Sequence, residues 1–119
     1  MNGFIIGRIK SLKYATRGCL LLIKTEHSIM AQVCICAIVI VLGFYFDISG
    51  QDWINQSIIM ALVLGVESLN TAVEKLADFI HPDHHSKIGF IKDIAAGAVT
   101  FTAITAFLVF SIIYSPYFF

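Results

Sequence analysis

The chain has 119 residues, 58 % of them hydrophobic, and it carries eight acidic and eight basic side chains. This length leaves room for one domain, and the mean hydropathy of +0.85 excludes an ordinary water-soluble domain. Five of the eight cations precede residue 25, so the zero net charge hides a strong asymmetry. The basic start lacks a compact apolar core followed by a small-residue cleavage site, so we expect no secretory signal peptide.

The first expected element is a surface helix at about residues 3–26. Its apolar and basic residues fall on different helical faces, which is typical of an amphipathic helix on a membrane. The alternative is that this basic segment only sets the topology of the protein in the membrane. Glu26 lies where this segment gives way to the first apolar run, and a lone glutamate at such a boundary is usually just solvated.

Three spanning helices follow, at about 29–46, 54–80 and 88–114, because about 20 residues cross a hydrocarbon core of roughly 30 Å. The Asp47–Asp52 turn joins the first two, and His81-Pro82 ends the second. The small residues Ala95–Ala98 near the start of the third favour close helix packing. The sequence thus predicts a single all-α integral membrane domain over 1–119.

Topology follows from the distribution of the cations. The basic N-terminal segment and the loop between residues 75 and 92 are separated by two spans, so they share one side of the membrane. The positive-inside rule makes that side cytoplasmic. We therefore expect a multi-pass membrane protein with the candidate polar residues near the cytoplasmic interface, where ATP is available.

A polar stripe runs along the end of the second span. Glu67, Asn70, Glu74 and Asp78 are spaced +3, +4 and +4, which places them on one helical face. An ionised carboxylate at mid-bilayer costs about 3 kcal/mol by insertion scales. The stripe therefore needs a cation, a partner helix or a water-filled site. A structural alternative pairs Glu67 and Glu74 with Lys75 or Lys92, and Asp78 either continues the stripe or caps the helix end.

These residue types suit phosphoryl transfer, in which positioning and charge neutralisation supply most of the catalysis. Carboxylates of the stripe, with Glu26 and Asp93, can hold Mg²⁺, which binds oxygen ligands and substrate phosphates. Lys92 and the cations of the first helix can hold phosphate oxygens, and a remaining carboxylate can act as general base on an alcohol. A zinc site at His81, His84 and His85 is disfavoured because no second ligand cluster lies nearby in the sequence.

Two segments carry a resemblance to a known family. Glu67-Ser68-Leu69-Asn70-Thr71-Ala72-Val73-Glu74, followed by Lys92-Asp93-Ile94-Ala95-Ala96-Gly97-Ala98, resembles the signature of the prokaryotic diacylglycerol kinases. The resemblance extends from about Arg8 to Phe110. It implies a homotrimeric inner-membrane kinase with active sites between protomers, whose partners are a membrane lipid, ATP and other copies of itself, with no nucleic acid.

The resemblance also implies roles for individual residues. Glu67 is the expected general base, and Glu26 and Glu74 are the expected ligands of the Mg²⁺ that accompanies ATP. Asn70 is expected to position groups in the site, with Ala96 and Arg8 on the substrate side. The expected ATP contacts are Tyr14, Glu26, Glu74, Asp83, His84, His85, Lys92 and Asp93.

The lipid acceptor is expected to be diacylglycerol, giving phosphatidic acid, with undecaprenol as the alternative. In the family that this chain resembles, diacylglycerol-preferring members have an acidic residue six positions after the first metal-binding glutamate. This chain has Gln32 at that position. Lys10–Ala15 also resembles the undecaprenol kinase branch. A more distant alternative is a proton- or cation-coupled transporter that uses Glu67 and Glu74. A transporter, however, would not need residues such as Lys92-Asp93 that can bind phosphate groups. A purely structural subunit would leave the acidic stripe unexplained.

Overall fold

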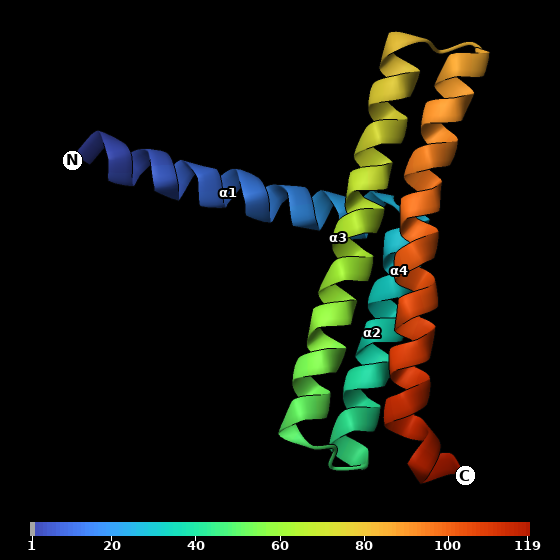
Figure 1. Ribbon diagram of the computed structural model, residues 1–119. Helices are drawn as coiled ribbons and strands as arrows, with labels where there is room; N and C mark the ends of the chain where they lie inside the picture. Colours follow the sequence, from blue (N-terminus) through green and yellow to red (C-terminus); the bar gives the residue numbers. More distant parts are fainter. Residues whose placement is uncertain (1) are drawn as a thin grey trace.

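The computed structural model describes residues 2–119, which form four α-helices joined by short connections (Figure 1). The helices are α1 (Asn2–Thr25), α2 (His27–Tyr45), α3 (Gly50–Ile80) and α4 (Ser86–Phe118). Helices α2, α3 and α4 are long and apolar enough to cross a membrane. The expected all-α architecture of one N-terminal helix and three spanning helices is confirmed.

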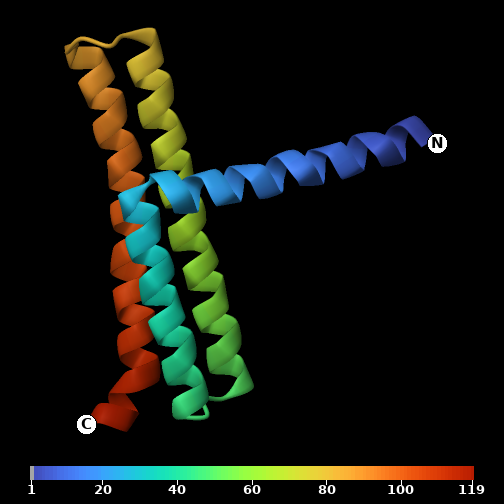
Figure 2. The ribbon, with the colours of Figure 1, turned by 180° about the vertical axis from the view of Figure 1, so that it is seen from behind.

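Helix α1 projects sideways from a bundle formed by the other three helices (Figures 1 and 2). Only Glu26 separates α1 from α2, and its extended backbone (φ −107°, ψ 114°) turns the chain through the corner. If the bundle crosses the membrane, this geometry places α1 along the membrane surface, as its amphipathic sequence indicates. Glu26 is therefore the residue at which the surface helix meets the spanning bundle.

The spanning helices differ in length, and the difference lies at one end of the bundle. At 1.5 Å per residue, α2 is about 28 Å long, whereas α3 and α4 are about 46 Å and 50 Å. Figure 1 shows that the end of α3 and the start of α4 continue past the level of α1 as a helical hairpin. Helix α2 alone matches the hydrocarbon thickness, so this hairpin extends beyond it toward water.

Two helices extend further than the sequence pattern predicts. Helix α3 begins at Gly50 rather than near residue 54, because the Ser49 hydroxyl accepts a hydrogen bond from the Asp52 N–H (3.1 Å) and caps the first turn. Helix α4 continues through Pro116 to Phe118, and the Phe119 N–H donates to the Ser115 carbonyl (2.9 Å). The aromatic residues Tyr117 and Phe118 therefore lie in the last turn of a helix.

The tightest packing lies at the end of the bundle opposite the hairpin. Val39, Ile48, Ile113 and Tyr114 form a buried apolar cluster there. Gly43 lets α2 approach α3, because a Cβ at this position would lie 2.7 Å from the Trp53 ring.

The small residues Ala95–Ala98 do not form a tight seam within the described chain. Ala96 and Ala98 are exposed, and a Cβ at Gly97 would meet no atom of the described part of the chain within 4 Å. Within one protomer, this face of α4 is therefore free to contact something else.

Candidate active site

The polar stripe of α3 passes from the buried bundle into the exposed hairpin. Glu67 and Asn70 are each 8 % exposed, while Glu74 and Asp78 are exposed. The Asn70 side-chain amide donates to Glu74 Oε1 (3.2 Å), which confirms that these two residues share a face. Asn70 Oδ1 is buried and has no hydrogen-bond partner among residues 2–119. The stripe thus offers a buried carboxylate, an unpaired amide oxygen and an exposed carboxylate in order along one helix.

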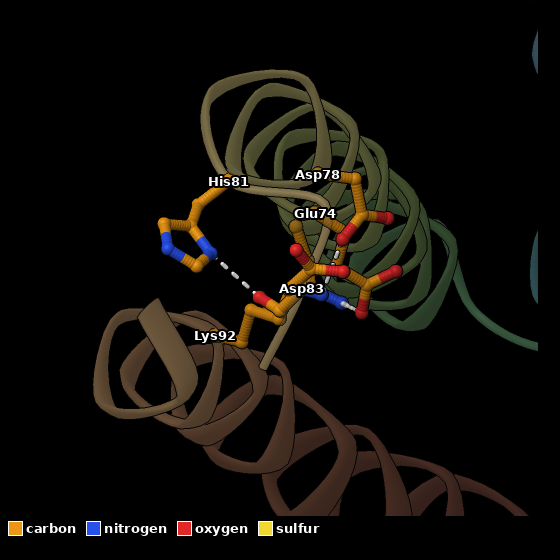
Figure 3. Close-up of polar contacts among 6 residues, drawn as sticks. Glu74, Asp78, His81, Asp83 and Lys92 are labelled. Carbon is orange, nitrogen blue, oxygen red and sulfur yellow. Dashed lines mark hydrogen bonds and ion pairs between the residues drawn. The ribbon is translucent and has the colours of Figure 1, made fainter. Parts of the chain in front are cut away.

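Asp78 forms an ion pair across the hairpin. Lys92 Nζ on α4 lies 2.5 Å from Asp78 Oδ1, so Asp78 joins the two helices rather than capping the end of α3 (Figure 3). This contact holds the ammonium of Lys92, an expected ATP contact, beside the end of the stripe. Figure 3 shows the Asp78–Lys92 pair beside the loop residues His81 and Asp83, which line the same pocket.

The loop between α3 and α4 encloses a small polar pocket. One nitrogen of the His81 ring, Nδ1, hydrogen-bonds to the Asp83 carbonyl oxygen (2.7 Å), and His85 Nδ1 accepts from the Lys87 N–H (3.1 Å) at the start of α4. The pocket has a volume of about 100 Å³. It is lined by Asp78, His81, Pro82, Asp83, His84, His85, Ile88, Gly89 and Lys92, which include four of the expected ATP contacts.

Glu26 is brought against α3 by the corner between α1 and α2. Its Oε1 lies 3.0 Å from Lys75 Nζ, and its side chain is only 22 % exposed, compared with 69 % for Lys75. Glu26 is therefore not a freely solvated boundary residue. The structural alternative, in which Glu67 and Glu74 pair with lysines, is not what the protomer shows, because Lys75 pairs with Glu26 and Lys92 pairs with Asp78.

The expected magnesium ligands do not make a complete metal centre from one protomer. No group of three or more His, Cys, Asp and Glu side chains in residues 2–119 is arranged to hold a metal ion. The oxygen donors that are present fit Mg²⁺ nonetheless, since this ion commonly binds through one or two carboxylates plus phosphates. The unpaired Oδ1 of Asn70 is a further oxygen of the right type.

Other expected site residues lie apart from the stripe. Tyr14 and Arg8 are exposed on α1, which leads away from the bundle (Figure 2). They precede Glu26 by 12 and 18 residues, which is about 18 Å and 27 Å along a helix. Asp93 and Ala96 are exposed on α4. Within the protomer, Tyr14 and Arg8 therefore lie away from Glu67.

An apolar groove leads toward the stripe, and sequence reasoning did not find it. The groove has a volume of about 360 Å³. Its lining comes from α2 (Gln32, Ile35, Cys36), α3 (Met60, Val63) and α4 (Ala103, Ala106, Phe107, Phe110). On α3, Met60, Val63 and Glu67 follow one another at +3 and +4, so the buried carboxylate lies one turn beyond the groove on the same face. Gln32 Oε1 is also buried with no partner in the described chain.

Comparisons with known proteins agree with this arrangement. Residues 13–114 match the family model described as prokaryotic diacylglycerol kinase. The chain is also 30 % identical to an undecaprenol kinase of Bacillus subtilis (strain 168) over 107 residues, which cover 90 % of this chain and 87 % of the relative. The chain therefore belongs to the prokaryotic diacylglycerol kinase family and is a multi-pass membrane lipid kinase.

Proposed function

We propose that the protein transfers the γ-phosphate of Mg-ATP to the hydroxyl group of a membrane lipid at the cytoplasmic interface. The observation that carries this proposal is the position of Glu67. Glu67 as a residue is 8 % exposed, and it lies one helical turn beyond an apolar groove of about 360 Å³. A lipid chain in that groove would bring its hydroxyl to the level of Glu67, and a general base must lie within hydrogen-bond reach of the proton it removes.

The chain's other polar residues suit the nucleotide side of the reaction. Asn70 holds Glu74 through its amide, and the ion pair with Asp78 holds Lys92 beside the polar pocket of the 81–85 loop. Glu26 and Glu74 would be the protein ligands of Mg²⁺, which neutralises charge on the phosphates when it is bound. Lys92, Asp93 and the loop residues would contact the nucleotide.

We further propose that the active form is a homotrimer with sites between protomers. Tyr14 and Arg8 lie too far along α1 to reach Glu67 of their own chain, and the Ala95–Ala98 face of α4 has no tight partner within the described residues. Small residues let helix backbones approach in a membrane. A second copy could therefore supply both the missing α1 residues and the partner for α4.

Two acceptors are candidates. Diacylglycerol is the acceptor that the family resemblance led us to expect. Two observations support undecaprenol as the second candidate: the similarity to an undecaprenol kinase, and Gln32, which lines the groove where an acid was expected for a diacylglycerol kinase. Offering both lipids to one preparation, with radiolabelled ATP, decides between them by the rate at which each is labelled.

The same assay tests the reaction itself. General-base catalysis contributes about 10²- to 10⁴-fold to rate, so Glu67→Gln is expected to lower kcat by at least about 100-fold. Asp47→Asn is the matched control, because Asp47 lies in the turn at the opposite end of the bundle, where its positive φ of 50° suits Asn. Failure to label any lipid, or Glu67→Gln retaining full activity, would refute the proposal.

A further inference from the structure

Lys75 lies beside a proposed metal ligand without belonging to the acidic stripe. It follows Glu74 directly, which rotates its side chain about 100° around the helix from that stripe. Its ammonium reaches the corner between α1 and α2, where it lies 3.0 Å from Glu26 Oε1. The carboxylate in this pair is mostly covered, whereas the lysine is 69 % exposed.

This arrangement makes the lysine the mobile partner of the ion pair. Lys75 has a flexible four-carbon stem that can swing its ammonium into water. Glu26 is held at a corner fixed by the chain itself, where one extended residue joins two helices. A divalent cation that approached Glu26 would be repelled by an ammonium in contact with the same carboxylate. The ammonium end of the pair is exposed to water, which weakens the attraction, so the lysine can be displaced.

Building on the proposed function, we propose that Lys75 is a positioning residue that occupies Glu26 when no metal is bound and competes with the metal for that carboxylate. The ammonium keeps the corner carboxylate against α3, and it leaves when the divalent ion binds. Lys75 thereby lowers the affinity of the site for the metal, although Lys75 is not itself a metal ligand.

The test measures Mn²⁺ binding to the detergent-solubilised full-length protein without nucleotide, from the electron paramagnetic resonance signal of free Mn²⁺. Lys75→Met removes the charge but keeps the length, and it is expected to lower the apparent Kd for Mn²⁺ about fivefold, or about 1 kcal/mol. Lys75→Arg should restore the wild-type Kd because it keeps the cation. Lys87→Met is the matched control, since Lys87 is exposed at the start of α4 and forms no ion pair in the described chain.

A double-mutant comparison assigns the effect to Glu26. In a Glu26→Gln background, Lys75→Met is expected to change Mn²⁺ binding no further, because the contested carboxylate is gone. A purely structural role for the pair would not tighten metal binding. Unchanged or weaker binding in Lys75→Met, or equal tightening in both backgrounds, would overturn the inference.

The inference and the proposed function can fail separately. An active lipid kinase whose Mn²⁺ affinity is insensitive to Lys75→Met would overturn the role of Lys75 alone. Tightening that depends on Glu26, in a protein that labels no lipid, would support the role of Lys75 and overturn the kinase proposal.

Discussion

Tyr114 joins all three spanning helices at the end of the bundle farthest from the active site. Its hydroxyl lies 2.6 Å from Gln56 Oε1 on α3 and 3.0 Å from the Val39 carbonyl on α2. Gln56 is fully buried, and its Nε2 has no partner within residues 2–119. In Tyr114→Phe, neither polar atom of this amide would have a partner.

The expected cost follows from that loss. A buried group left unsatisfied costs about 1–3 kcal/mol in proteins generally, whereas hydrogen bonds between membrane helices average about 0.6 kcal/mol with a maximum near 1.7. We expect Tyr114→Phe to lower the free energy of unfolding by about 1–2 kcal/mol. Gln56→Leu should cost less than this, because the Tyr114 hydroxyl keeps the Val39 carbonyl as its acceptor.

The double variant provides the sharper comparison. Replacing both partners of a hydrogen bond by apolar groups of similar shape can be nearly neutral, so Tyr114→Phe/Gln56→Leu is expected to be more stable than Tyr114→Phe alone. The assay is reversible unfolding in mixed micelles by denaturing detergent, with kinase activity at low temperature as the check that the active site is intact. Destabilisation of the double variant by the sum of the two single effects would refute this reasoning.

Two further predictions address the bundle and the groove. Gly43→Ala should destabilise the protein by about 1–3 kcal/mol, the usual cost of overpacking, because the new Cβ would lie 2.7 Å from the Trp53 ring. The same unfolding assay should show that stability recovers when Trp53→Phe removes part of that ring. An unchanged unfolding midpoint for Gly43→Ala would contradict the close packing. Ala103→Phe should raise the KM for the lipid several-fold without changing the KM for ATP, because Ala103 lines the apolar groove but not the polar pocket. An equal change in both KM values would contradict the proposal that the lipid binds in the groove.

The sequence by itself determined the helices and the polar face of α3. Spans of about 20 apolar residues and the +3, +4, +4 spacing of Glu67, Asn70, Glu74 and Asp78 are local patterns. They fix which residues share a helix and a face, whatever the other helices do. The family signature in the same residues supplied the roles expected of Glu67, Glu74 and Lys92, and the family itself is confirmed.

The tertiary structure decided which charges meet and where the groove lies. Lys75 adjoins Glu74 in the sequence but contacts Glu26, and Asp78 contacts Lys92 fourteen residues later. The groove needs α2, α3 and α4 together. The Lys75–Glu26 contact depends on the corner at Glu26, and the Asp78–Lys92 contact depends on the α3–α4 hairpin. Such angles arise from packing between residues distant in the sequence, so no local pattern encodes them.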